Sequence, residues 1–366
     1  MDRIDPAFGR DASRLLGLPR PDASCHEPAY APPDGAVFPD HPMARAIVAA
    51  LMCAGPGAAS VGWRAEDGCA ERVARIGLEQ VRVRLHCWNA ELAWREVTGI
   101  TPLALSTLVV LVDRLQRTTR KGVVLSPGEV LAARGCRRWG GERQALERQI
   151  GHELLRLGVM TLNDSRNPLF SVAPIGDEGD QFFVALDPAV KARWAASPQR
   201  RIDWRLLNFD HRHNRGADIL ALKMGLYFGV AGAGLRPVTR SVRAVLKGVG
   251  ALDDGGCSGR GGRLADHFEE AALRLQERGL FALTYRGAGE SSVVDERTKG
   301  WVSRWLDSVV VVRAAQSGRD SADDAFSGAC GFGRHGEPGA QARIRLRGGL
   351  LEGAGGKDIS ADYRGK

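Results

Sequence analysis

The stretch Leu264–Tyr285, LADHFEEAALRLQERGLFALTY, predicts an amphipathic helix followed by a short strand. Its apolar residues recur at the spacing that places them on one side of a helix, and they are Leu264, Phe268, Ala271, Ala272 and Leu275. Gly279 stands where the helix should end, because glycine readily adopts the conformation that closes a last turn. The residues from Leu280 to Tyr285 then favour an extended strand.

A second stretch earlier in the chain has the same pattern. In Arg143–Leu162, RQALERQIGHELLRLGVMTL, the apolar stripe is formed by Leu146, Ile150, Leu154 and Leu157. Gly158 follows, and Val159–Leu162 is predicted as a strand. A helix, a glycine and a strand therefore occur twice, which indicates an internal duplication detectable by pattern and not by residue identity.

The composition sets limits on the class of protein. The chain has 366 residues, which is enough for two or three domains with cores of their own. Lys and Arg number 51 against 43 Asp and Glu, and the formal net charge of +8 suits a polyanionic partner. The seven cysteines are scattered without a CxxC pair, so the sequence predicts neither a disulfide framework nor a zinc module.

The first copy extends on both sides of Arg143–Leu162. Ser126-Pro127-Gly128-Glu129 predicts a helix that starts with a capping box. The expected elements, in order, are a helix at Pro102–Gln116, a strand at Val123–Leu125, helices at Ser126–Arg134 and Glu142–Leu157, and strands at Val159–Leu162, Leu169–Ala173 and Gln181–Leu186. This order is typical of a winged helix, a helix-turn-helix with a β-hairpin wing, and Val159–Leu162 is predicted as its first wing strand.

The second copy repeats the order. Its predicted elements are helices at Ala217–Gly229, Pro237–Lys247 and Leu264–Arg278, a strand ending at Tyr285, and a returning strand at Ser308–Val312. The sequence therefore predicts an α+β, mainly helical fold with two tandem winged-helix domains and disordered termini. The expected boundaries are a tail at 1–40, domains at 41–200 and 201–316, and a tail at 317–366.

Both long helices carry polar residues away from their apolar stripes, as a helix that contacts base edges in the major groove must. The candidate DNA-binding residues of the first copy are Arg137, Arg138, Arg143, Gln144 and Arg148. Those of the second copy are Arg240, Arg243, Lys247, Arg260, Arg263, His267 and Arg274. One such helix alone could be an ordinary solvated basic face, but two of them, each followed by a wing pattern, favour DNA binding.

These strings support a resemblance to a known family. LSPGEVLAARG, CRRWGG, ERQALERQIGHELLRLGVMTL, LADHFEEAALRLQERGLFALTY and WVSRWLDSVVVV resemble the tandem winged-helix replication initiator (Rep) proteins of plasmids and other mobile elements. The resemblance spans Gln80 to Arg313 and is one of pattern. It implies two winged helices side by side that bind repeated origin sites in double-stranded DNA, recruit host replication helicase machinery and perform no covalent chemistry.

The resemblance also implies roles for individual residues. Arg143, Gln144 and Arg148 match the first recognition helix, and Arg263, His267 and Arg274 match the second. The Gly-rich loop Gly248–Gly262 is longer than in compact members of the family, so the start of the second recognition helix stays open.

Enzyme signatures are weak. His211 and His213 flank Arg212, whereas a rolling-circle nickase holds its metal with two histidines around an apolar residue, and the Arg212 cation opposes a metal ion. Gly353–Ile359, GAGGKDI, matches a phosphate loop only in part, because the first Gly and the final Ser or Thr are missing. We therefore expect no enzymatic activity, no metal and no cofactor.

Several alternatives stay open. A transcriptional regulator or a partition protein could use the same scaffold, and a metal-dependent DNA nickase-relaxase or a protein-binding adaptor represent other classes. The sequence gives neither the DNA target nor the oligomeric state, so a homodimer is left open. The N-terminus has no apolar signal-peptide core, and no apolar run approaches the roughly 20 residues that span a bilayer. A soluble, cytoplasmic protein without a membrane partner is expected.

Overall fold

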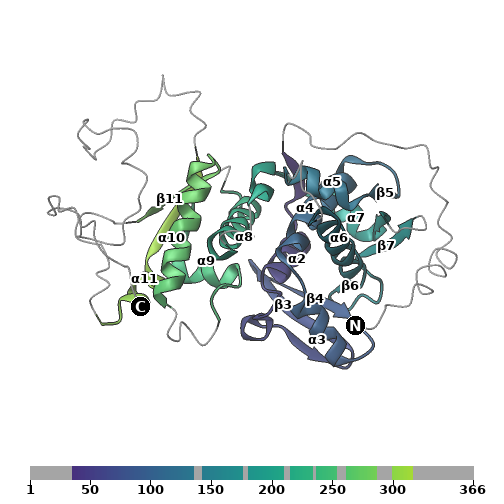
Figure 1. Ribbon diagram of the computed structural model, residues 1–366, viewed down its shortest axis with the longest axis horizontal. Coiled ribbons are helices and arrows are strands. Elements are labelled where there is room, and N and C mark those ends of the chain that lie inside the picture. Colours follow the sequence, from purple (N-terminus) through teal and green to yellow (C-terminus); the bar gives the residue numbers. More distant parts are fainter. Residues whose placement is uncertain are drawn as a thin grey trace, which may run out of the picture.

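The computed structural model describes residues 35–135, 142–175, 180–209, 215–233, 236–253, 261–286 and 299–315. Both predicted tails fall outside these ranges except for residues 35–40. The predicted DNA-binding residues Arg137, Arg138 and Arg260 also lie outside the described residues. The described chain has an α+β fold in which two helical units, each with a small sheet, lie next to each other (Figure 1).

The first unit contains the elements predicted around the capping box. They are α4 (Pro102–Arg117), β5 (Gly122–Leu125), α5 (Pro127–Ala133), α6 (Glu142–Gly158), β7 (Phe170–Ile175) and β8 (Gln181–Leu186). The strands form an antiparallel sheet in the order β5-β8-β7. The capping box is confirmed, because the Ser126 side chain accepts from the Glu129 N–H and the Glu129 side chain accepts from the Ser126 N–H.

The second unit repeats this connectivity. Its elements are α8 (Arg215–Ala231), β10 (Val238–Ser241), α9 (Val242–Gly248), α10 (Gly261–Glu277), β11 (Phe281–Tyr285), α11 (Trp301–Asp307) and β12 (Val309–Ala314). The strand order β10-β12-β11 corresponds to β5-β8-β7, with the last strand in the middle of each sheet. The two units therefore share one order of helices and strands apart from two additions. The first unit has a short strand at Met160–Leu162 between α6 and β7, and the second has α11 between its last two strands.

Two predicted elements are wrong in part. The helix predicted at Pro237–Lys247 begins only at Val242, because residues 238–241 form strand β10. Ser241 ends that strand, and its side chain accepts from the Ala244 N–H as the N-cap of α9. The strand predicted at Val159–Leu162 exists as β6 (Met160–Leu162), but it pairs with a strand of another sheet and does not belong to the hairpin β7–β8.

A four-stranded sheet precedes the first unit and was only partly predicted. Its order is β2-β3-β4-β6, with β2 (Arg64–Glu66), β3 (Cys69–Ile76) and β4 (Glu79–His86). The strand predicted at Gln80–Cys87 is confirmed as β4, whereas β2 and β3 were missed. Helices α2 (Pro42–Met52) and α3 (Ala90–Thr98) pack on this sheet, and η1 (Ala58–Val61) lies between α2 and β2.

Part of the predicted N-terminal tail belongs to the folded body. Strand β1 (Ala36–Pro39) pairs antiparallel with β9 (Gln199–Ile202), which follows α7 (Pro188–Ala196) and precedes η2 (Trp204–Asn208). The fully buried carboxylate of Asp113 in α4 accepts from the Val37 N–H at 2.5 Å and from Arg117 Nε at 2.8 Å. The boundary predicted at residue 40 is therefore wrong.

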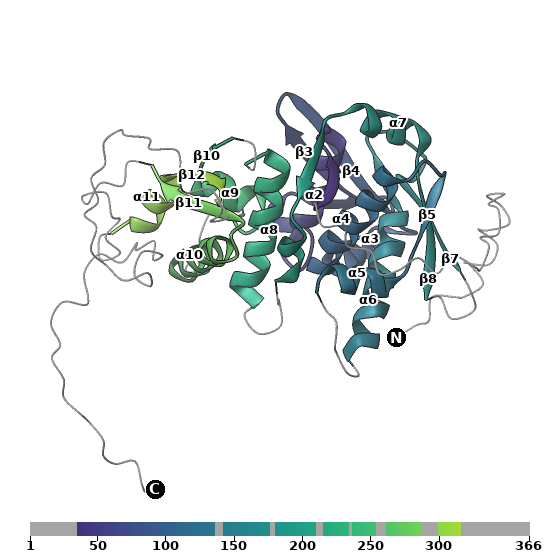
Figure 2. The same ribbon diagram turned by 90° about the horizontal axis from the view of Figure 1, so that it is seen from above.

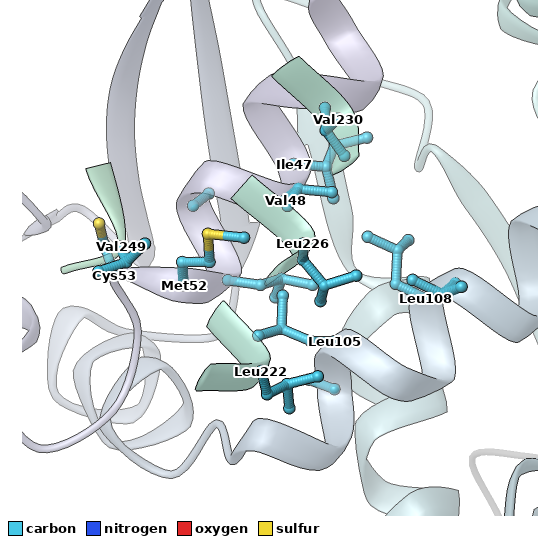
Figure 3. Packing of buried hydrophobic residues seen from close by; sticks show 14 of the residues in the cluster. Ile47, Val48, Met52, Cys53, Leu105, Leu108, Leu222, Leu226, Val230 and Val249 are labelled. Atoms are coloured by element: carbon cyan, nitrogen blue, oxygen red, sulfur yellow. The ribbon is translucent and has the colours of Figure 1, made fainter. Parts of the chain in front are cut away.

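The two units are joined by an apolar interface, and Figure 3 shows this packing. Its labelled side chains come from α2, α4, α8 and the residue after α9, and they include Ile47, Val48, Met52, Leu105, Leu108, Leu222, Leu226, Val230 and Val249. All of them belong to one continuous buried cluster. The Lys223 ammonium of α8 donates to the carbonyl of Met52 at the end of α2. The buried core therefore continues from one unit into the other without a break.

Within the described residues, no single helix combines the length and the hydropathy needed to cross a membrane. Helices α3 and α4 pass that test only as a pair, and they are bent by 85° at the break between them.

Candidate nucleic-acid interface

Helix α6 is held in place by its buried side. Ile150, Leu154 and Leu157 are each at most 1% exposed. The carboxylate of Glu153 on the same side is fully buried, and its Oε1 accepts from the Thr101 N–H at 3.0 Å and from the Thr101 hydroxyl at 2.8 Å. Because Thr101 is the N-cap residue of α4, these bonds fix α6 against the start of α4.

The opposite side of α6 is open to solvent. Figure 2 shows its N-terminal end projecting beyond the other helices. Four exposed side chains follow one another at helical spacing along this side, and a fifth comes directly after the helix. Together they form what we call the α6 stripe: Gln144, Arg148, His152 and Leu155 in α6, and Val159 in the turn that follows it. Leu155 and Val159 are 39% and 40% exposed. Neither residue is among the predicted DNA-binding residues, and Leu155 does not belong to the apolar stripe predicted for this helix.

The predicted residue Arg143 has a different environment from the stripe. Its Nε lies 2.8 Å from Glu147 Oε1, one turn further along α6. Both side chains approach Gly128 in the first turn of α5, where a Cβ would lie 3.4 Å from the Arg143 guanidinium. Arg143 is half exposed, and its charge is balanced by Glu147. It therefore lies at the edge of the candidate surface, between α5 and α6.

Arg156, in the last turn of α6, has a structural position. Its Nε donates to Glu96 Oε2 at 2.7 Å, and its Nη1 donates to the Gly99 carbonyl at 3.0 Å and to Glu153 Oε1 at 3.2 Å. Burial raises the pKa of the Glu153 carboxyl, and the Arg156 cation opposes that shift. The guanidinium thus joins α6 to α3 and is not directed toward a ligand.

In the second unit, two of the predicted DNA-binding residues face the protein. The His267 ring lies against Gly216 of α8, where an added Cβ would be 2.3 Å from a ring atom. Arg274 forms ion pairs with Asp218 of α8 and, at 2.6 Å, with Glu270 of its own helix. The structure thus places His267 and Arg274 at the contact with α8, and their role in DNA binding stays a prediction.

The remaining predicted residues of the second unit are dispersed. Arg240 lies on strand β10, and its Nη1 donates to the Thr239 carbonyl at 2.8 Å. Arg243, in the first turn of α9, forms a 2.9 Å ion pair with Asp307 of α11. Lys247 is exposed in the last turn of α9, and Arg263 is exposed in the first turn of α10. The structure does not gather these four side chains on one helix face.

A buried chain of hydrogen bonds connects α10 to β11 and α11. The Tyr285 hydroxyl of β11 donates to Glu269 Oε1 of α10 at 2.5 Å, and the Trp305 Nε1–H of α11 donates to the Tyr285 oxygen at 3.2 Å. Burial raises the pKa of Glu269 to about 7. Within the described ranges, no three His, Cys, Asp or Glu side chains are grouped to hold a metal ion, and His211 and His213 lie outside these ranges.

Comparisons with known proteins give only distant likeness. No protein-family model and no curated protein matches the chain. A crystal structure of domains 2 and 3 of RctB, a selenomethionine derivative, is similar with a TM-score of 0.39 and 12% identity, over 73% of this chain and 99% of that one. A second structure of these domains has a TM-score of 0.35 and 11% identity, over 66% of this chain and 84% of that one.

Proposed function

We propose that the chain is a sequence-specific double-stranded DNA-binding protein in which each unit is a winged helix and α6 enters a major groove. The observation that carries this proposal is the α6 stripe. It is a solvent-exposed row of polar and apolar side chains that contains no carboxylate, and the opposite side of α6 is buried in the protein. The strand orders β5-β8-β7 and β10-β12-β11 support the winged-helix assignment, since in each unit two paired antiparallel strands follow the helix α6 or α10 in the chain, after β6 in the first unit and around α11 in the second.

The stripe has the chemistry for base recognition. An arginine such as Arg148 can donate two hydrogen bonds to the O6 and N7 of guanine, and a glutamine such as Gln144 can pair with the N6 and N7 of adenine. The apolar side chains of Leu155 and Val159 suit the methyl group of thymine. The major groove is about 12 Å wide and admits a helix, so α6 can bring these groups to consecutive base edges.

Recognition of origin repeats by a replication initiator is the specific role that we propose, on the strength of the resemblance in sequence pattern. The fixed apolar interface between the units supports this role, because it holds two helix-turn-helix modules in one relative position on DNA. A transcriptional regulator or a partition protein on the same scaffold is the alternative. Loss of autonomous maintenance of the replicon after deletion of the gene, restored by the gene in trans, would favour the initiator.

DNA binding itself is tested by selection from a random duplex library with the full-length protein, followed by titration of the enriched duplex. Wild-type protein should enrich one motif and bind it more tightly than a scrambled duplex. Arg148→Ala should lose about 1–3 kcal/mol on the motif and relax the preference at one base pair. Arg75→Ala, which removes an exposed arginine from β3, serves as the charge-matched control. The proposal fails if wild-type protein binds no duplex at low salt.

A further inference from the structure

Helices α6 and α10 present corresponding faces to their units. Their buried positions match when Ile150 is aligned with Phe268, and the same alignment pairs Leu154 with Ala272 and Leu157 with Leu275. All six side chains are at most 1% exposed. Because a helix has a fixed angular spacing, matched buried positions place the remaining positions in matched directions as well.

The outward positions of the two helices carry opposite chemistry. In this alignment Arg148 corresponds to Asp266 and His152 to Glu270, and Val159, which directly follows α6, corresponds to Glu277. The outward residues of α10 form what we call the α10 stripe: Arg263, Asp266, Glu270, Leu273 and Glu277. Asp266 and Glu277 are exposed, and the Glu270 side chain keeps 40% of its surface open while it contacts Arg274. The α10 stripe thus carries three carboxylates and one guanidinium, whereas the α6 stripe carries no carboxylate and one guanidinium.

A carboxylate row is unfavourable in a DNA groove. Phosphates border both sides of the groove, with one negative charge for about every 1.7 Å of duplex. An acidic side chain can accept a hydrogen bond from the cytosine amino group, but that single interaction does not offset repulsion by both phosphate rows. A unit charge about 4 Å from a phosphate changes an affinity about fivefold in water, so three carboxylates in a groove weaken binding about a hundredfold.

We propose that base recognition by this chain resides in the first unit alone, and that the α10 stripe stays outside the major groove when α6 is bound. This inference rests on the proposed DNA-binding function and goes beyond it, because the sequence pattern predicts two equivalent recognition helices. One protein chain then recognises the sequence of a single half-site. Helix α10 recognises no bases in the next turn of the duplex. The Arg263 side chain contributes no base contact.

The first test is neutralisation of the α10 stripe. Asp266→Asn/Glu270→Gln/Glu277→Gln is titrated against the selected duplex at ~0.15 M salt, where charges more than about 8 Å apart are largely screened. If the stripe is outside the groove, the affinity changes less than fivefold. Tighter binding by fivefold or more would overturn the proposal. Since Glu270 also holds Arg274, the double variant Asp266→Asn/Glu277→Gln, which keeps that pair, is measured in parallel with the same threshold.

The converse substitution on α6 is the matched control. Arg148→Asp places on α6 the residue type that α10 carries at the corresponding position, and it should weaken binding of the selected duplex at least tenfold. Motif selection is then repeated with Arg148→Ala and with Arg263→Ala. Arg148→Ala should change the enriched motif, and Arg263→Ala should leave it unchanged.

The outcomes separate this inference from the proposed function. If no duplex is bound by the wild-type protein, the proposed function fails and the inference fails with it. If the selected motif contains two half-sites and Arg263→Ala relaxes the second one, only the inference is overturned. If the selected motif contains a single half-site, and Arg148→Ala changes it while Arg263→Ala does not, the result supports both the proposed function and this inference.

Discussion

Arg156 and Arg274 occupy corresponding positions in α6 and α10, and each guanidinium is bound by two carboxylates. Arg156 lies between Glu96 and Glu153, and Arg274 lies between Asp218 and Glu270. Both pairs of contacts connect a long helix to a neighbouring one, α3 in the first unit and α8 in the second. The last turns of the two long helices are thus attached to their units in the same way, by an arginine that pairs with two carboxylates.

Substitution of Arg274 should affect stability and not DNA affinity. Arg274→Ala leaves the carboxylate of Asp218, which is 4% exposed, without this cation, so we expect a loss of about 1–3 kcal/mol in the free energy of unfolding. Urea denaturation measures this loss, and titration of the selected duplex should give an unchanged affinity. Weaker DNA binding by a folded variant would show that Arg274 contacts DNA, as the sequence pattern predicts.

The Glu269 carboxyl gives the stability a pH dependence. Its pKa is raised from an ordinary value near 4.5 to about 7 because it is buried, so the folded state keeps a proton that the unfolded state releases. The stabilisation from this group is complete below about pH 4.5 and is lost as the pH rises through 7, by at most about 3 kcal/mol. Glu269→Gln removes that dependence, because an amide can accept from Tyr285 at every pH.

The measurement is the difference in unfolding free energy between Glu269→Gln and wild type from pH 4.5 to 8. The advantage of the variant should grow up to about pH 7 and then level off. Glu277→Gln, an exposed change on the same helix, should show no such trend. A constant difference across the whole range would contradict the assignment of the buried proton to Glu269.

Gly250 should be required at the interface between the units. It adopts φ +69°, and a Cβ there would lie 2.8 Å from both the Met52 carbonyl oxygen and the Cys53 Cα at the end of α2. Left-handed strain of about 1 kcal/mol then adds to a clash with backbone that cannot rotate away, so Gly250→Ala should destabilise the protein by about 2 kcal/mol or more. Gly77→Ala is the control, since Gly77 has φ +64° but no atom within 4 Å of its Cβ position. Equal losses for both variants would contradict a tight interface.

Helical periodicity predicted the parts of the fold that local sequence determines. The stripes in 142–158 and 261–277 gave both long helices, and the Ser126 and Glu129 pair gave the start of α5, because caps act over four residues. Strand β3 was missed because Glu71, Arg72 and Arg75 interrupt the apolar alternation. The end of the predicted tail was assigned wrongly because β1 is held by β9 and Asp113, which are distant in sequence.

The candidate DNA-binding residues, like the fold, were predicted correctly only where local sequence determines which side of a helix is exposed. Gln144 and Arg148 were identified because they lie opposite a clear apolar stripe, and both are exposed. His267 and Arg274 lie at the side of α10 that contacts α8, and no local pattern reveals which polar side of a helix a distant helix covers. The acidic nature of the α10 stripe was present in the sequence, but only the packing of α8 showed that these carboxylates occupy the outward face.

The most direct test of DNA recognition by α6 compares duplex binding by wild-type protein, Arg148→Ala and Arg75→Ala, each titrated against the selected motif and a scrambled duplex at one salt concentration. The account predicts that Arg148→Ala loses about 1–3 kcal/mol on the motif and much less on the scrambled duplex, whereas Arg75→Ala keeps the wild-type preference. Equal binding of motif and scrambled duplex by the wild-type protein, or an unchanged preference in Arg148→Ala, would contradict it.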